Sequence, residues 1–280
     1  MPKTLFVTDL DGTLLTSGQY VSEKSREIIN GLIERGAIFS YATARSLITA
    51  KKVTSGLAVK APVIVNNGVF IVDAMTGEKL IKNTFSSKQA EDIYGTLSDF
   101  GIKPLVYSII DGTEKFSYMP QRITRAMRDF LNTRSGDPRH RPLSGEEGIL
   151  DGEPFYITCM DEAGSMSEAC EELKTRYYCV YGRDIYSGDQ WLEILPEKAT
   201  KAHAVMQLKE YCGCEKVVAF GDAVNDIPMF KAADECYAVE NAAPELKNIA
   251  DGIIGSNNED SVAKFILKYF SKNTVKYSNP

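Results

Sequence analysis

The fold prediction rests on one segment, Thr4-Leu5-Phe6-Val7-Thr8-Asp9-Leu10-Asp11-Gly12-Thr13, in which a short apolar run leads into an acidic turn. Residues 4–8 combine β-branched and large apolar side chains, which is typical of a buried strand. Two carboxylates at positions i and i+2 converge on one site where the chain turns after a strand, and Gly12 suits such a turn. Aspartate pairs also occur in ordinary loops, so this pattern alone does not establish a site.

Helix and strand patterns alternate through the next part of the chain. The predicted elements are a helix at 22–35, a strand at 37–42, a helix through about residue 55 and a strand at 62–65. This alternation predicts an α/β fold with a doubly wound, Rossmann-like parallel sheet. Ligands of such sheets bind beyond the carboxyl ends of the strands, which points to residues 8–13, 43–45 and 66–68.

An α+β pattern interrupts this alternation between residues 84 and 194. Its predicted helices lie at 86–100, 122–134 and about 165–176, its strands at 105–110, 115–118, 155–160, 177–181 and 191–195, and a polar loop at 139–152. After residue 200 the alternation resumes, with strands at 217–220 and 236–239 and a last helix to residue 270. We therefore expect a core of residues 1–83 plus 195–280 and an inserted cap domain at 84–194, whose 12 basic and 19 acidic residues give net charge −7.

The composition of the 280 residues disfavours several classes of protein. A net charge of −6 disfavours a nucleic-acid binder, which needs a basic surface. No apolar run approaches the ~20 residues of a membrane-spanning helix, and the amino terminus shows no signal-peptide pattern, so we expect a cytoplasmic protein without a membrane partner. With two histidines and a lone Cys212-x-Cys214, neither a histidine-based triad nor a zinc site is expected.

A second acidic cluster, Gly221-Asp222-Ala223-Val224-Asn225-Asp226, follows the predicted strand at 217–220. Parallel strands end at the same edge of a sheet, so this cluster is expected near Asp9 and Asp11. Carboxylate oxygens with almost no histidine favour a hard cation such as Mg²⁺ over zinc.

Thr43 and Lys201 are further candidates, each with an ordinary alternative. Thr43 follows the second strand, where its hydroxyl and nearby amides suit a phosphate, but a helix N-cap threonine gives the same pattern. Lys201 opens the helix after the insertion, and the alternative is a solvated lysine, with Lys198 as a competitor. Asn241 either lines the edge of the site or belongs to a turn.

In this order, the motifs resemble those of the haloacid dehalogenase superfamily, and more narrowly its Cof-type sugar-phosphatase branch with a type IIB cap. They are Asp9-Leu10-Asp11-Gly12-Thr13-Leu14, Ala42-Thr43-Ala44-Arg45, Asn67-Gly68, Lys201, and Gly221-Asp222 with Asn225-Asp226. The resemblance extends to about residue 270, and the ordered set is specific although no single motif is. One departure is Ala44, where the family usually has glycine.

The resemblance implies a role for each matching position. Asp9 would be the nucleophile, and Asp11 the acid that protonates the leaving group and then the base that activates water. The other implied roles are phosphate or substrate binding by Thr43, Ala44, Arg45, Asn67, Lys201 and Asn225, and Mg²⁺ binding by Asp9, the Asp11 backbone carbonyl and Asp222, with Asp226 supporting the metal or Lys201. Mg²⁺ and a lysine would offset the repulsion between a carboxylate nucleophile and a phosphate dianion.

The resemblance thus implies a Mg²⁺-dependent phosphatase that hydrolyses a small phosphorylated metabolite, such as a sugar phosphate, through an aspartyl-phosphate intermediate. A phosphosugar mutase of the same superfamily is an alternative, as is a non-catalytic binding or regulatory protein that kept the fold. Another alternative is an interaction module that docks through its acidic cap.

Three features of the insertion invite a functional interpretation but have ordinary alternatives. Asp111-Gly112 imitates the first motif and is predicted to be a hairpin turn. Six arginines between residues 120 and 141 form either a solvated face with an Arg125–Asp129 pair or contacts to the substrate. Trp191 is predicted to belong to the core, and Glu193 either faces the substrate or is structural.

Overall fold

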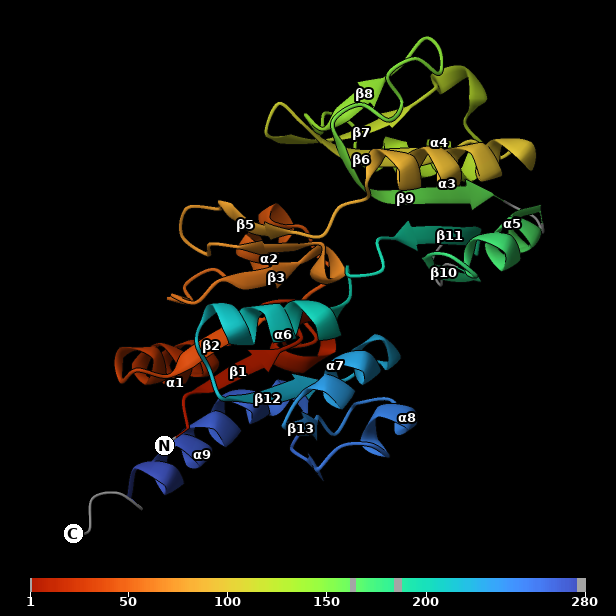
Figure 1. Ribbon diagram of the computed structural model, residues 1–280. Helices are drawn as coiled ribbons and strands as arrows, with labels where there is room; N and C mark the ends of the chain where they lie inside the picture. Colours follow the sequence, from red (N-terminus) through yellow and green to blue (C-terminus); the bar gives the residue numbers. More distant parts are fainter. Residues whose placement is uncertain (1, 162–164, 184–187, 276–280) are drawn as a thin grey trace. The chain divides into compact units, whose positions relative to one another are not determined.

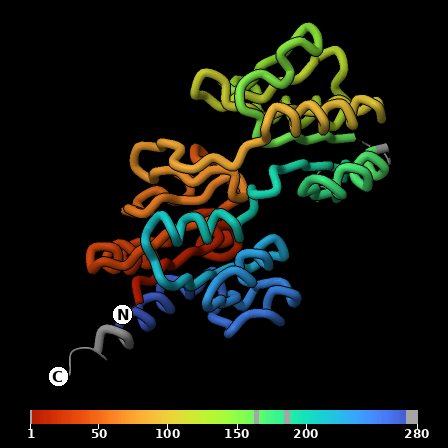
Figure 2. The backbone as a smooth tube through the Cα atoms, viewed as in Figure 1, coloured from red at the N-terminus to blue at the C-terminus, as the bar shows by residue number. Residues whose placement is uncertain are grey.

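The computed structural model describes residues 2–161, 165–183 and 188–275, and these form two compact units (Figure 1). The first unit combines the described residues up to Lys82 with those from Lys198 onward, and the second spans Asn83–Glu197. Figure 2 traces how the chain leaves the first unit after Lys82 and returns to it at Lys198. Within the described residues, no helix is both long and apolar enough to cross a membrane.

A five-stranded sheet forms the centre of the first unit, in the order β14-β13-β12-β1-β2, and all its pairings are parallel. Its strands are β1 (Thr4–Thr8), β2 (Ile38–Tyr41), β12 (Lys216–Gly221), β13 (Glu235–Ala238) and β14 (Gly252–Ile253). The chain moves outward from β1 to β2 and later returns on the other side of β1 to β12. This reversal between β1 and β12 is where open α/β sheets bind ligands, beyond the carboxyl ends of the strands.

The helices of the first unit pack in pairs, α1 beside α9 and α6 beside α7. They are α1 (Glu23–Glu34), α2 (Leu47–Val53), α6 (Lys201–Tyr211), α7 (Ile227–Ala232), α8 (Pro244–Lys247) and α9 (Ser261–Val275). Figure 1 shows α6 and α9 on opposite sides of β1 and β12. The Rossmann-like α/β prediction is therefore confirmed, although α9 continues beyond the expected end at residue 270.

The predicted third parallel strand was wrong in its pairing. β3 (Val63–Val65) forms an antiparallel sheet with β4 (Phe70–Val72), which also pairs with β5 (Lys79–Lys82). A single parallel bridge from Ile64 to Ala42 links β3 to the end of β2. The cause is the turn at residues 66–68, whose positive φ angles send the chain straight back along β3.

The second unit contains a mixed sheet in the order β10-β11-β9-β6-β7-β8. Its elements are α3 (Ser87–Asp99), β6 (Leu105–Ile110), β7 (Thr113–Tyr118), α4 (Arg125–Asn132), β8 (His140–Pro142), β9 (Glu153–Asp161), α5 (Ser165–Leu173), β10 (Tyr178–Arg183) and β11 (Gln190–Leu195). Residues of α3 and α5 pack in one apolar cluster and residues of α4 in another. The hairpin turn at Asp111-Gly112 is confirmed, with φ of 50° and 77°.

Two details of the second unit differ from the sequence prediction. The predicted polar loop at 139–152 contains the short strand β8, which pairs with β7. The helix expected from residue 122 begins at Arg125, because the Thr124 hydroxyl accepts a hydrogen bond from the Met127 N–H and so caps the helix there.

Candidate active site

Three aspartates from the carboxyl ends of β1 and β12 form a buried cluster. Asp9 follows β1 directly, and its N–H donates to the carbonyl of Phe220 over 2.9 Å. Asp222 and Asp226 follow β12, and one carboxylate oxygen of each of the three aspartates lies within 4.8 Å of the others. Asp9 is 6% exposed and Asp226 fully buried, so the cluster lies where the sheet reversal places a ligand site.

Lys201 lies inside this cluster. Its Nζ donates to Oδ1 of Asp9 over 2.5 Å and to Oδ1 of Asp226 over 2.7 Å. The helix that carries it begins at this residue, because the Thr200 hydroxyl caps α6 by accepting from the His203 N–H. Lys201 is only 4% exposed, which excludes the solvated alternative, whereas Lys198 is exposed.

Asp226 fixes the geometry of the second acidic turn. Its Oδ2 accepts hydrogen bonds from the N–H groups of Asp222 and Ala223, over 3.1 and 3.2 Å. Its other oxygen binds Lys201. Asp226 therefore ties the loop of Asp222 to the lysine, while Asn225 lies exposed in the same turn.

Burial and charge act in opposite directions on the ionisable groups. Burial raises the pKa of the Asp9 carboxyl to about 7, against the lowering effect of Lys201, and also raises the pKa of Asp222. Burial opposes the charged form of Lys201, but the attraction of Asp9 and Asp226 outweighs it and raises the pKa of the ammonium. Three ionised carboxylates and one ammonium carry net charge −2, and buried charge of this kind requires compensation. A divalent cation with oxygen ligands, such as Mg²⁺, fits that donor set.

Asp11 lies apart from the carboxylate cluster and pairs with Arg45. The guanidinium donates from Nε to Oδ2 over 2.8 Å and from Nη2 to Oδ1 over 2.6 Å, a bidentate arrangement. This hydrogen bonding raises the pKa of Arg45. The Asp11 side chain is 49% exposed, so its carboxylate is held in place yet remains open to solvent.

Thr43 lies in the same loop as Arg45, between β2 and α2. Thr43 is buried, and its Oγ1 accepts a hydrogen bond from the Arg45 N–H over 3.1 Å. The N-cap of α2 is Ser46, which corrects the alternative that Thr43 caps this helix. Ala44 is exposed in the loop, and the Asn67 N–H donates to the carbonyl of Thr43.

Gly12 and Thr13 bring the first motif against Asp222. The Thr13 hydroxyl donates to Oδ1 of Asp222 over 2.8 Å. A Cβ at Gly12 would lie 2.3 Å from Oδ2 of Asp222, and the φ of Gly12 is +76°. Both the close approach and the left-handed backbone therefore require glycine at this position.

The sequence model of the haloacid dehalogenase-like hydrolases matches residues 6–266. The chain belongs to this family. The 5-amino-6-(5-phospho-D-ribitylamino)uracil phosphatase YwtE of Bacillus subtilis strain 168 is 30% identical, over 94% of this chain and 96% of that protein. The HMP-PP phosphatase of Serratia proteamaculans is 24% identical, over 96% of each chain.

Solved structures agree with this assignment at the level of fold. A protein of Eubacterium rectale superposes with a TM-score of 0.77 at 20% identity, over 95% of this chain and 98% of that one. A protein of Thermotoga maritima gives a TM-score of 0.75 at 24% identity, over 96% and 97%. With the named phosphatases among its relatives, this haloacid dehalogenase-like protein is a phosphoric-monoester hydrolase.

Gly68 of this hydrolase packs against the residue that precedes Lys201. Residues 66–68 all have positive φ, and a Cβ on Gly68 would lie 2.4 Å from the backbone oxygen of Thr200. The Gly68 turn therefore sets the position at which α6 begins, and with it the position of Lys201.

We expect Gly68→Ala to be more destabilising than Gly36→Ala, a matched control with similar φ but no atom within 4 Å of its Cβ. The left-handed backbone alone costs about 1–2 kcal/mol with alanine, and the clash at Gly68 adds about 1–3 kcal/mol. Denaturant unfolding measures both, and kcat of Gly68→Ala should fall as Lys201 moves. Equal losses for the two variants would contradict the steric argument.

Five of the six arginines between residues 120 and 141 bind acidic or backbone groups of the second unit, namely Arg122, Arg125, Arg134, Arg139 and Arg141. The predicted Arg125–Asp129 pair is present at 3.1 Å. Other pairs are Arg122–Glu146, Arg139–Asp137 and Arg141–Asp151. Glu193 accepts a hydrogen bond from the Tyr156 hydroxyl, and Trp191 packs edge-on against Phe130 at 5.3 Å. These contacts favour the structural interpretation of the arginines.

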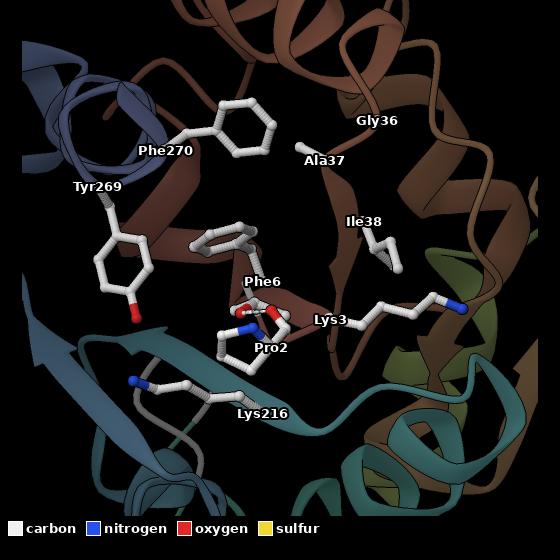
Figure 3. Close-up of a pocket in the computed structure, with 10 residues that line it drawn as sticks. Pro2, Lys3, Phe6, Gly36, Ala37, Ile38, Lys216, Tyr269 and Phe270 are labelled. Atoms are coloured by element: carbon white, nitrogen blue, oxygen red, sulfur yellow. Dashed lines mark hydrogen bonds between the residues drawn. The ribbon is translucent and has the colours of Figure 1, made fainter. Parts of the chain in front are cut away.

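A separate cavity of about 380 Å³ opens at the amino-terminal edge of the core sheet (Figure 3). It is lined by the first residues of β1, β2 and β12 and by aromatic side chains that include Phe6, Tyr269 and Phe270. The aspartate cluster lies at the other ends of β1 and β12, so this cavity is separate from it.

Proposed function

We propose that this hydrolase is Mg²⁺-dependent and cleaves small phosphorylated metabolites, sugar phosphates among them, through a phosphoaspartate on Asp9. The cluster of Asp9, Asp222 and Asp226 around Lys201 is the observation that carries the proposal. Its net charge of −2 suits a divalent cation held by Asp9, Asp222 and the Asp11 carbonyl. Asp226 would support this site by binding Lys201 and the backbone of the Asp222 loop. When bound, Mg²⁺ would neutralise charge on the phosphoryl oxygens.

Asp9 is the nucleophile in this proposal. Its Oδ1 accepts from Lys201, and we assign the attack on phosphorus to Oδ2. The Oδ2–P bond forms as the bond from phosphorus to the ester oxygen breaks, and the ester oxygen takes a proton from Asp11. The Lys201 ammonium and the Thr43 hydroxyl hold the phosphoryl oxygens, with contacts from Ala44, Asn67 and Asn225.

Asp11 then acts as a base in the second half of the reaction. Deprotonated by the first step, it takes a proton from water as the water oxygen attacks phosphorus. The bond between phosphorus and Asp9 breaks, which returns the carboxylate and releases phosphate. The bidentate pair with Arg45 orients the Asp11 carboxylate, the form that acts as the base, and we assign Arg45 a further contact with the substrate.

Removal of the metal is expected to abolish phosphate release from p-nitrophenyl phosphate, and Mg²⁺ should restore it. Asp222→Asn removes one anionic ligand, so we expect the Mg²⁺ concentration for half-maximal activity to rise by about tenfold or more. Asp73→Asn, in an exposed turn of the same unit, is the control and should leave this concentration unchanged. Full activity in EDTA would contradict the proposed metal dependence.

The names of two relatives indicate the kind of substrate. One is named for a phosphoribityl compound and the other for HMP-PP, and both relatives match nearly the whole chain. A panel of sugar and sugar-alcohol phosphates, assayed for free phosphate and for isomerised product, tests the substrate class. Release of phosphate supports hydrolysis, whereas isomerised sugar phosphate without free phosphate would identify a mutase.

A further inference from the structure

Asn241 reaches the first motif from a distant part of the chain. It lies in the loop between β13 and α8, and its Nδ2 donates to the carbonyl of Gly12 over 2.7 Å. Its Oδ1 accepts from the N–H of Asn257 over 3.0 Å. Both ends of the carboxamide are therefore engaged, which fixes its orientation between two loops.

Asn257 extends this connection to the far end of the same motif. It is buried, and its Nδ2 donates to the carbonyl of Leu15 over 2.9 Å. Asn241 and Asn257, which we call the asparagine bridge, thus hold the carbonyls of Gly12 and Leu15, which flank Thr13 and Leu14 in the sequence. The bridge fixes the backbone that follows Asp11.

Gly12 connects the Asn241 hydrogen bond to the carboxylate cluster. It has positive φ, lies against Asp222 and is followed by Thr13, which binds Asp222. A rotation of the Gly12–Thr13 peptide would therefore change where Asp11 lies relative to Asp222. The Asp11 side chain is half-exposed and bound by Arg45, so the contact at the Gly12 carbonyl is a separate restraint that acts on the backbone beside it.

We propose that Asn241 is a positioning residue that holds Asp11 in place for proton transfer to the leaving group. The inference rests on the proposed function, in which Asp11 is the general acid. Asn241 acts through the Gly12 carbonyl and has no assigned contact with the substrate. Its removal should therefore weaken acid catalysis more than substrate binding.

The test compares two aryl phosphates of similar size whose leaving groups differ in basicity. The nitrophenolate of p-nitrophenyl phosphate leaves with little help from an acid, whereas the leaving group of phenyl phosphate needs a proton. In Asn241→Asp, a carboxylate oxygen replaces Nδ2 and repels the Gly12 carbonyl. We expect kcat/KM for phenyl phosphate to fall about tenfold more than for p-nitrophenyl phosphate, with KM nearly unchanged.

Asn30→Asp is the matched control. Asn30 bridges two backbone groups in the same way, donating from Nδ2 to the carbonyl of Gly56 over 2.9 Å and accepting from the Ala58 N–H over 2.8 Å. Its bridge lies away from the aspartate loop, so both substrates should be turned over as in the wild type. Asn241→Ser removes the bond without adding charge, and thermal unfolding of each variant shows whether it is folded.

Asp11→Asn separates failure of the inference from failure of the proposed function. Suppose that Asp11→Asn lowers kcat/KM selectively for phenyl phosphate. If the folded Asn241 variants then show no loss, or an equal loss of kcat/KM for both substrates, Asn241 does not position the acid. If Asp11→Asn itself loses both substrates equally, its role as general acid is wrong and the inference falls with it. A selective loss in Asp11→Asn and in both Asn241 variants supports the inference.

Discussion

Asp9→Asn is expected to lower phosphate release by about 10⁴-fold or more, because an amide does not form the covalent intermediate and the alternative attack by water lacks a positioned nucleophile. Oδ1 of the wild-type carboxylate binds Lys201, and an asparagine oxygen still accepts that hydrogen bond. The loss should therefore come from chemistry and not from a displaced lysine. A p-nitrophenyl phosphate assay with excess Mg²⁺ measures it.

Thermal unfolding separates this chemical loss from misfolding. Asp9→Asn reduces the cluster charge from −2 to −1, which relieves repulsion with Asp222 and Asp226 in the metal-free protein. We therefore expect the unfolding midpoint of the variant in EDTA to equal or exceed that of the wild type. A lower midpoint with the same loss of activity would show that Asp9 is mainly a structural residue.

The intermediate gives a second check on Asp9. Asp11→Asn keeps the nucleophile but lacks the base for hydrolysis, so a phosphoenzyme should accumulate with p-nitrophenyl phosphate. Mass spectrometry should find one phosphoryl group on the peptide that contains Asp9. In the double variant with Asp9→Asn the modification should disappear, and a phosphoryl group that persists there would assign the nucleophile to another residue.

The sequence predicts that the two acidic motifs converge, because each directly follows a strand of a parallel sheet. Parallel strands end at one edge, so Asp9 and Asp222 were expected to lie together, and they do. The position of Lys201 followed from resemblance, because a lysine at a helix start is ordinarily exposed. Its burial depends on the distant carboxylates of Asp9 and Asp226 and on the approach of Gly68 to the Thr200 backbone, which no local pattern shows.

The features that the sequence did not reveal depend on contacts between distant residues. Asn241 binds a carbonyl 229 positions away, and Arg45 binds a carboxylate 34 positions away. Local periodicity contains no information on such pairs. The pairing of β3 depends on the turn at residues 66–68, because its position after a strand predicts a ligand loop whereas its positive φ angles reverse the chain.

Lys201→Met is expected to destabilise the metal-free protein by about 3–5 kcal/mol, since removal of one partner leaves buried charges without compensation. The ammonium contacts both Asp9 and Asp226, over 2.5 and 2.7 Å. Lys209→Met, on the same helix with one surface pair to Asp234, is the control and should cost about 0–1 kcal/mol. Urea unfolding in EDTA gives both values, and activity should fall about 10²–10³-fold in Lys201→Met alone.

Relative to the wild type, the Mg²⁺-induced rise in unfolding midpoint should be larger in Lys201→Met and smaller in Asp9→Asn. Lys201→Met leaves net charge −3 around the proposed metal site, so Mg²⁺ should bind it more tightly and raise its unfolding midpoint more than that of the wild type. Asp9→Asn leaves net charge −1 and one ligand fewer, so its midpoint should respond less. Changes in side-chain size or packing would not explain this difference in the Mg²⁺ response, because they do not depend on the sign of the charge removed. If Mg²⁺ shifts all three midpoints equally, the ion does not bind among Asp9, Asp222 and Asp226.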